Sequence, residues 1–130
     1  MHERVATDEV AQPAGPWSMG VKAQPGELLF IAGAVALDPD GHLVGPGDVE
    51  AQTHQVMRNF QAVVEAAGMR MSDVVKITTF MIDVAQYGAM ARVRAQYLTE
   101  PYPASTLVEV TSLLYAGLLV EIDGIAVRSS

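Results

Sequence analysis

The sequence contains no cysteine. This absence excludes disulfide bonds, thiolate nucleophiles and cysteine-ligated zinc or iron–sulfur sites. Long apolar runs are also absent, because none approaches the ~18 residues that a membrane-spanning helix needs. The first ten residues, MHERVATDEV, lack the apolar stretch of a secretory signal. We therefore expect a cytoplasmic protein without a membrane partner.

Positive charge is scarce. Eight Lys and Arg residues stand against fifteen Asp and Glu residues, which gives a formal net charge of −7. Proteins that bind phosphate backbones carry basic patches, whereas the basic residues here are scattered, as Arg92 and Arg94 are. Nucleic acid is therefore not an expected partner.

Motifs for metals and cofactors are missing as well. The histidines stand at positions 2, 42 and 54 without the spacing to acids that metal sites show, and His54 is predicted on a solvated helix face. Asp38 and Asp40 in DPDG fit a type I turn better than a calcium loop, because the later calcium ligands are absent. No GxGxxG or phosphate-binding loop occurs. The sequence therefore predicts neither a metal nor a cofactor.

The patterning predicts one α+β domain spanning residues 1–130. The apolar run 28–37 predicts a strand buried on both faces. Apolar spacing predicts a helix after Asp48, its N-cap, that stops at Gly68. The remaining expected elements are a β-branched strand at 74–83, a helix at 85–100 that Pro101 stops, and two closing strands at 105–114 and 118–128. This order predicts a sheet with both helices on one face.

The strand at 74–83 carries large apolar residues on both of its faces. Val74, Phe80 and Ile82 alternate with Val75, Ile77 and Met81. Since two helices cover only one face, the other face is expected to meet another copy of the chain.

Two acids interrupt the last apolar run, LLVEIDGIAV. Glu121 and Asp123 are two residues apart, so on a strand they point to the same face. Carboxylates among aliphatic side chains are candidates for a functional site. The alternative is that they reach solvent at the rim of an interface or pair with an arginine of a neighbouring subunit.

Several segments together resemble the reactive intermediate deaminase superfamily, the RidA/YjgF-like proteins. These segments are AGPWSMG, LLFIAGAVALDPDG, VVEAAGMRMSDVVKITTFMIDV, YPASTLVEV and VEIDGIAV, and they span about Pro13 to Arg128. The resemblance implies a chorismate-mutase-like fold assembled as a homotrimer with a central barrel and three clefts between subunits. It also implies that the last strand lies beside the strands at 28–37 and 74–83, rather than in a simple hairpin with the strand before it.

The resemblance implies hydrolysis of reactive enamines and imines, such as 2-aminoacrylate, by a set of cleft residues that this chain changes. Ser105 stands where those proteins carry the arginine that holds the substrate carboxylate, and Asp123 stands where they carry the glutamate that positions water. Trp17 replaces a tyrosine, Ala32 a serine and Ala91 an asparagine. The expected cleft therefore has Asp123 as its catalytic residue and is lined by Trp17, Ala32, Gly33, Tyr87, Ala91, Ser105, Thr106, Leu107 and Glu121. An alternative is that Arg92 or Arg94 reaches into this cleft, although a solvated helix face is the expected position of both.

Three functions remain open at this level. The first is hydrolysis of an enamine or imine other than 2-aminoacrylate, because a serine hydroxyl holds a carboxylate less strongly than a guanidinium does. The second is a small-molecule-binding or regulatory trimer without catalysis. The third is the endoribonuclease or translation-inhibitor activity ascribed to some relatives, which the net negative charge disfavours.

Overall fold

The computed structural model describes residues 2–129 and shows a mixed sheet with two helices. Its strands are β1 (His2–Val5), β2 (Gly20–Ala23), β3 (Gly26–Ala34), β4 (Val74–Met81), β5 (Ala104–Glu109) and β6 (Val120–Ser129). Its helices are α1 (Val49–Ala66) and α2 (Tyr87–Ala95), with short 3-10 turns η1 (Met71–Asp73) and η2 (Val84–Gln86). No helix in the described part of the chain has the length and apolarity to cross a membrane.

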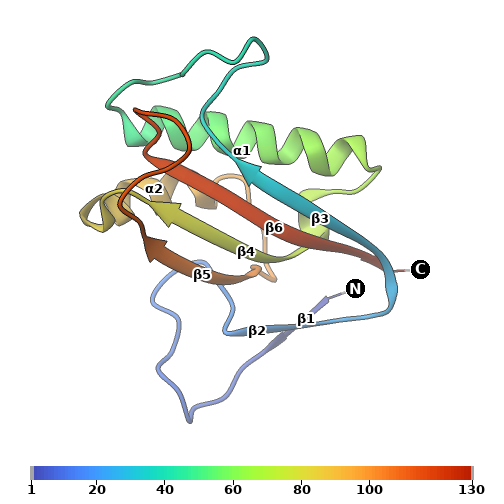
Figure 1. Ribbon diagram of the computed structural model, residues 1–130. Helices are drawn as coiled ribbons and strands as arrows, with labels where there is room; N and C mark the ends of the chain where they lie inside the picture. The colour runs from blue at the N-terminus through green and yellow to red at the C-terminus, as the bar shows by residue number, and fades with distance from the viewer. Residues whose placement is uncertain (1, 130) are drawn as a thin grey trace.

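The main sheet has the strand order β3-β6-β4-β5. Strand β6 is antiparallel to both of its neighbours, and β4 runs parallel to β5. Both helices lie on one face of this sheet (Figure 1). The last strand therefore lies between β3 and β4, as the family resemblance implied, and a simple hairpin of the two closing strands is ruled out.

Helix α1 begins and ends at the residues that the sequence predicts. The Asp48 side chain accepts a hydrogen bond from the backbone N–H of Ala51 at 3.0 Å. Gly68 follows the helix with a φ of +75°, a conformation that glycine adopts without steric cost. These two caps fix the ends of the helix that covers the centre of the sheet.

The core lies between α1 and the inner face of β6. Val120, Ile122 and Ala126 are fully buried at alternating positions of that strand. Gly124 belongs to the same row, and a Cβ there would stand 2.8 Å from Phe60 Cζ of α1. The absence of a side chain at Gly124 therefore lets the helix approach the sheet closely, and the odd-numbered residues of β6 point to the other face.

Strand β3 corrects a prediction, because it is an edge strand rather than one buried on both faces. Leu28 is 60% exposed and Phe30 is 70% exposed. An apolar run alone does not distinguish a central strand from an edge strand whose outer face meets another molecule. The strand also ends earlier than expected, at Ala34, after an irregularity in its pairing between Ile31 and Ala34.

A second irregularity changes which residues of β4 share a face. The pairing of β4 with β6 shifts between Val74 and Lys76, so Val74, Ile77 and Met81 all lie buried beneath the helices. The strict alternation assumed from the sequence therefore fails at Val75. Phe80 faces away from the helices, as its pairing with Glu121 shows.

Helix α2 is shorter than predicted, and two N-terminal strands were not predicted. The helix spans 87–95 rather than 85–100, because residues 84–86 form the 3-10 turn η2. Strands β1 and β2 pair antiparallel into a hairpin of their own. The hairpin connects to the edge of β5 through a bridge between Ser18 and Ala104 (Figure 1).

Candidate functional site

Glu121 and Asp123 lie on the face of the main sheet opposite the helices, which we call the open face. Asp123 pairs with Thr78 of β4, and Glu121 pairs with Phe80. Both acids are half-buried. Within residues 2–129 neither carboxylate forms a hydrogen bond or an ion pair with another side chain. The open face thus presents two carboxylates that are free to bind a ligand or water.

Lys76 sits on the same face, and the sequence analysis did not single it out. Its Nζ donates hydrogen bonds to the hydroxyl oxygens of Thr78 at 3.2 Å and of Thr106 at 3.0 Å. It also donates to the carbonyl of Ile77 at 2.9 Å. Because Thr78 is the cross-strand partner of Asp123, the ammonium group brings positive charge to the surroundings of that carboxylate. Lys76 shares this face with Thr78 and Phe80 because the three residues alternate regularly along β4.

Ala32 and Gly33 lie at the irregularity of β3, beside Glu121. A Cβ at Gly33 would collide with the Glu121 carboxylate and stand 2.7 Å from its Cδ. The Glu121 side chain therefore rests against bare backbone. Both predicted residues of β3 are exposed, so this part of the open face is accessible.

Four other predicted residues lie on the helix side of the sheet. Ser105 pairs with buried Ile77, and Leu107 pairs with buried Thr79, so both β5 residues face α2. Tyr87 and Ala91 are one turn apart on α2. Ser105 is half-buried, and its side chain forms no hydrogen bond within the described residues. These residues make up a second group, separate from the acids.

Trp17 joins this second group through the loop before β2. The backbone N–H of Ser18 donates to the carbonyl of Pro103 at 3.0 Å, and the Ser18 hydroxyl donates to the carbonyl of Tyr102. A Cβ at Gly15 would stand 3.8 Å from the Tyr87 hydroxyl oxygen and 3.7 Å from Trp17 Cδ1. The indole is therefore held near the N-terminus of α2 and the beginning of β5.

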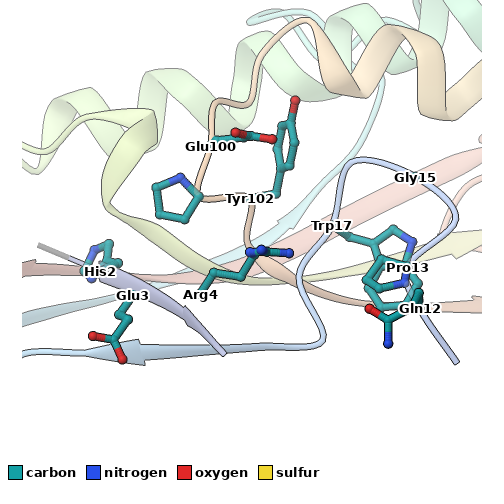
Figure 2. Close-up of a pocket in the computed structure, with 10 residues that line it drawn as sticks. His2, Glu3, Arg4, Gln12, Pro13, Gly15, Trp17, Glu100 and Tyr102 are labelled. Atoms are coloured by element: carbon teal, nitrogen blue, oxygen red, sulfur yellow. The ribbon is translucent and has the colours of Figure 1, made fainter. Parts of the chain in front are cut away.

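A cavity of about 710 Å³ opens beside Trp17. It lies between the β1–β2 hairpin and the segment before β5, and Figure 2 shows Arg4 extending from β1 toward that segment while Glu3 points away. Its lining consists of His2, Glu3, Arg4, Gln12, Pro13, Gly15, Trp17, Glu100, Pro101 and Tyr102. Of the predicted site residues only Trp17 lines this cavity, so the cavity is not the predicted cleft.

Arg94 is buried, which corrects its prediction on a solvated helix face. Its exposed fraction is 1%, whereas Arg92 on the same helix is exposed. Its Nη1 donates to the Thr79 hydroxyl at 3.0 Å, and its Cζ lies 6.0 Å from the centroid of the Tyr87 ring. Burial lowers the pKa of Arg94, and the neighbouring Tyr87 acts in the opposite direction. The guanidinium lies next to the second group of predicted residues.

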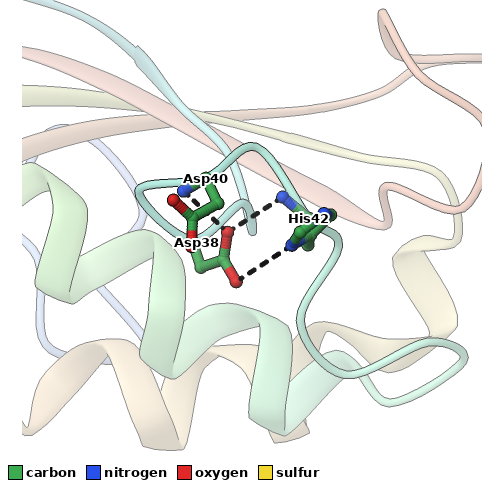
Figure 3. A group of neighbouring side chains, drawn as sticks. All are labelled: Asp38, Asp40 and His42. Carbon is green, nitrogen blue, oxygen red and sulfur yellow. Dashed lines mark hydrogen bonds and ion pairs between the residues drawn. The ribbon is translucent and has the colours of Figure 1, made fainter.

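His54 and the DPDG segment form hydrogen bonds that hold the fold together. Asp38 Oδ1 accepts hydrogen bonds from the backbone N–H groups of Asp40 at 3.0 Å and of His42 at 2.9 Å (Figure 3). Gly41 has a φ of +84°, and its N–H donates to the Asp38 carbonyl, so the predicted turn is confirmed. His54 Nδ1 lies 2.8 Å from the Tyr97 hydroxyl, so His54 joins α1 to the segment after α2 rather than facing solvent alone.

In one chain, the structure divides the predicted site between the two faces of the sheet. The open-face group is Ala32, Gly33, Thr106, Glu121 and Asp123. The helix-side group is Trp17, Tyr87, Ala91, Ser105 and Leu107. The sheet itself separates the two groups.

With this geometry established, comparison with known proteins decides the family. The Endoribonuclease L-PSP family matches residues 7–128 of the chain. The chain belongs to the Endoribonuclease L-PSP family.

Similar members of the Endoribonuclease L-PSP family carry RutC and Rid names. A RutC family protein of Pyrococcus horikoshii is 40% identical over 98% of this chain and 99% of its own length. The 2-iminobutanoate/2-iminopropanoate deaminase of Salmonella typhimurium is 34% identical over 98% of this chain and 99% of its own length. A Rid family protein of unknown function from Yersinia pestis has a solved structure that matches with a TM-score of 0.88, at 32% identity and 98% coverage of both chains. The resemblance noted in the sequence is thus confirmed for family and fold.

Proposed function

We propose that this protein hydrolyses a small reactive enamine or imine, in clefts formed between the subunits of a homotrimer, with Asp123 as the catalytic residue. The observation that carries the proposal is the Asp123 carboxylate. It is half-buried on the open face, without a hydrogen-bond partner among residues 2–129, and beside the threonine that Lys76 contacts. A carboxylate held in this way can accept a proton from water.

The reaction needs little more than an oriented water molecule. An enamine first takes a proton at carbon and loses one from nitrogen, which converts it to the imine. Water then adds to the imine carbon as Asp123 accepts a proton from it, and this proton is returned to the nitrogen to give a carbinolamine. The carbinolamine transfers its hydroxyl proton to the nitrogen and loses ammonia, which leaves a carbonyl group. The net change is imine plus water to carbonyl compound plus ammonia, so neither a metal nor a redox cofactor is required.

The assembly of the cleft from two copies follows from the separation of the two groups. Asp123 lies on the open face, whereas Tyr87 and Ser105 lie on the helix side of the same sheet. A substrate that contacts both therefore needs the open face of one copy and the helix side of another. Exposed Phe30 and Val108 give the open face the apolar character of an interface.

The substrate is proposed to differ from 2-aminoacrylate. Ser105 offers one neutral hydrogen bond where the resemblance implies a guanidinium, and a charge-assisted hydrogen bond is about twice as strong. We therefore propose for this chain the reaction type of the Salmonella relative, deamination of an imine, but a different substrate.

A coupled deaminase assay tests the proposal. A dehydratase generates 2-aminoacrylate and 2-aminocrotonate in place, and release of the keto acid is followed with the wild-type chain, Ser105→Arg and Asp123→Asn. We expect weak activity from the wild type and a gain from Ser105→Arg. Adding Asp123→Asn to Ser105→Arg should lower the rate of keto acid release by a factor of about 100 or more, the usual scale for loss of a general base.

The outcomes separate this proposal from its rivals. Full wild-type activity on 2-aminoacrylate would show that the weight placed on Ser105 is wrong. Hydrolysis that survives Asp123→Asn would contradict the assigned role of the acid. If Ser105→Arg is inactive as well, while small molecules bind and are released unaltered, the protein is a binding trimer rather than an enzyme.

A further inference from the structure

The Arg94 guanidinium is a buried cation with no acid beside it. It is 1% exposed, and no Asp or Glu of residues 2–129 lies within ion-pair distance. Its Nε has no hydrogen-bond partner in the described part of the chain. The neighbours that do contact it, Thr79 and Tyr87, are neutral.

Such an arrangement is unfavourable for the single chain. A guanidinium has five N–H donors and a full positive charge, and burial without a counter-charge costs more than the neutral contacts return. A methionine of similar length would fill the same space without that cost. Arg94 therefore carries a positive charge that does not stabilise the fold of the single chain.

Arg94 lies beside the helix-side group of site residues. Thr79, which accepts its hydrogen bond, pairs with Leu107 of β5, and Ser105 is the next residue of β5 on the same face. Tyr87 lies between Arg94 and the Trp17 loop, since Gly15 approaches the Tyr87 hydroxyl. The buried cation thus borders the helix-side group of site residues.

We propose that Arg94 is the anion-binding group of this cleft, and that it recognises a carboxylate of the ligand in place of the group missing at Ser105. The inference rests on the proposed function for the reacting part of the ligand. Because the guanidinium comes from α2 rather than from β5, the carboxylate lies at a different place from that of an α-imino acid. The ligand is therefore an enamine or imine whose carboxylate is separated from the reacting carbon by at least one further carbon.

The Trp17 loop lies next to Tyr87, the aromatic neighbour of Arg94. Tyr87 covers one side of the guanidinium, and the loop at 15–17 approaches the Tyr87 hydroxyl. An anion that reaches Arg94 displaces Tyr87 or this loop. Trp17 is the single tryptophan of the chain, so its fluorescence reports the event without a label.

The test uses stable carboxylates as probes, so it does not depend on turnover. Acetate, propionate, butyrate and succinate are titrated into the wild-type protein at constant ionic strength, with Trp17 fluorescence and calorimetry as readouts. Chloride at equal concentration controls for non-specific anion effects. We expect saturable binding that is weaker by about 10- to 100-fold in Arg94→Met, the usual scale for a lost charge-assisted contact. Arg92→Met, on the exposed side of the same helix, should bind like the wild type.

Thermal unfolding gives a second readout that a merely structural arginine would not produce. We expect Arg94→Met to unfold at a higher temperature than the wild type, because it removes an unpaired buried charge. Should Arg94→Met fail to fold, Arg94→Lys decides, since it keeps the charge but loses the fork and should bind more weakly. Carboxylate binding equal to wild type in a folded Arg94 variant would overturn the inference, as would an absence of saturable binding by the wild type.

Failure of this inference and failure of the proposed function are distinguishable. Asp123→Asn should retain carboxylate binding while losing turnover. Carboxylate binding that requires Arg94, together with turnover that ignores Asp123, would contradict the proposed function alone. Turnover that requires Asp123 with an unchanged KM in Arg94→Met would contradict the inference alone.

Discussion

At the scale of single residues, polar side chains were easier to place on strands than on the second helix. The two-residue spacing of Glu121 and Asp123 fixed their common face, because a strand alternates strictly. Arg94 was expected on a solvated helix face because of its charge, and nothing in the sequence indicates that Thr79 and Tyr87 contact it. Lys76 was not singled out because its contact with Thr106 depends on β4 and β5 being neighbours in the sheet.

Two glycines are expected to respond to alanine in opposite directions. A Cβ at Gly26 would collide with the Arg128 carbonyl and stand 2.8 Å from Ser129 Cα, and backbone cannot move aside easily. Gly26→Ala should therefore lower the free energy of unfolding by about 1–3 kcal/mol. At Gly88 on α2, the nearest atom is Arg92 Nη1, 3.6 Å away at the end of a flexible side chain.

Gly88→Ala should accordingly raise the free energy of unfolding by about 0.5–1 kcal/mol, the helix preference of alanine over glycine. Urea unfolding of the two variants and the wild type checks the pair. Equal effects at both positions would contradict the close approach at Gly26.

At the scale of elements, the caps of α1 were predictable and the edges of the sheets were not. Asp48 and Gly68 mark the ends of α1 because each satisfies a local requirement of helix geometry. Strands β1 and β2 are stabilised by pairing with each other. A short polar sequence such as His2–Val5 has no apolar pattern that would predict such a strand. The exposure of β3 depends on its place in the strand order, which one sequence does not reveal without a family resemblance.

Gln52 shows how one side chain of α1 positions the site. It is fully buried, and its Nε2 donates to the carbonyls of Gly45 at 3.1 Å and Gly117 at 2.8 Å. Its Oε1 accepts the N–H of Leu119 at 2.8 Å, just before β6 carries Glu121 and Asp123 across the open face. The amide thereby holds the beginning of the acid-bearing strand against the helix.

Gln52→Leu should therefore be among the more damaging single substitutions. It leaves the Gly117 carbonyl and the Leu119 N–H without their partner, whereas the Gly45 carbonyl still accepts the N–H of Asp48. We therefore expect a loss of about 1–3 kcal/mol in the free energy of unfolding. Gln55→Leu is the matched control, because Gln55 bonds only to the Asn59 side chain, within α1. Chemical denaturation measures both, and similar losses in the two variants would show that the amide bridge is unimportant.

At the scale of the whole molecule, charge and apolar surface point to different partners. The net charge of −7 disfavours RNA, despite the ribonuclease activity in the name of the family. The open face instead exposes Phe30 at 70% and Val108 at 39%, with Ile125 paired beside Phe30. That combination favours contact between copies of the chain, which the two-sided apolar pattern of β4 had already suggested.

Replacing Phe30 should therefore change the oligomeric state. Phe30→Glu places a charge in the exposed apolar area. We expect the wild type to sediment as the proposed trimer at micromolar concentration and Phe30→Glu to sediment as a monomer. Val63→Glu is the control, since Val63 is 45% exposed on the outer side of α1, away from the open face. A wild-type protein that sediments as a monomer, or a trimer that survives Phe30→Glu, would contradict the proposed assembly.

The central position of β6 has a consequence for synthesis on the ribosome. Strand β6 is translated after β3, β4 and β5, yet it lies between β3 and β4 and hydrogen-bonds to both. While β6 is still inside the exit tunnel, β3 has no partner in its sheet, and the apolar side of α1 has only part of its support. A nascent chain therefore leaves the tunnel with its hydrophobic surfaces exposed, and its sheet closes only once β6 is free, a long-range step of the kind that slows folding and invites chaperones.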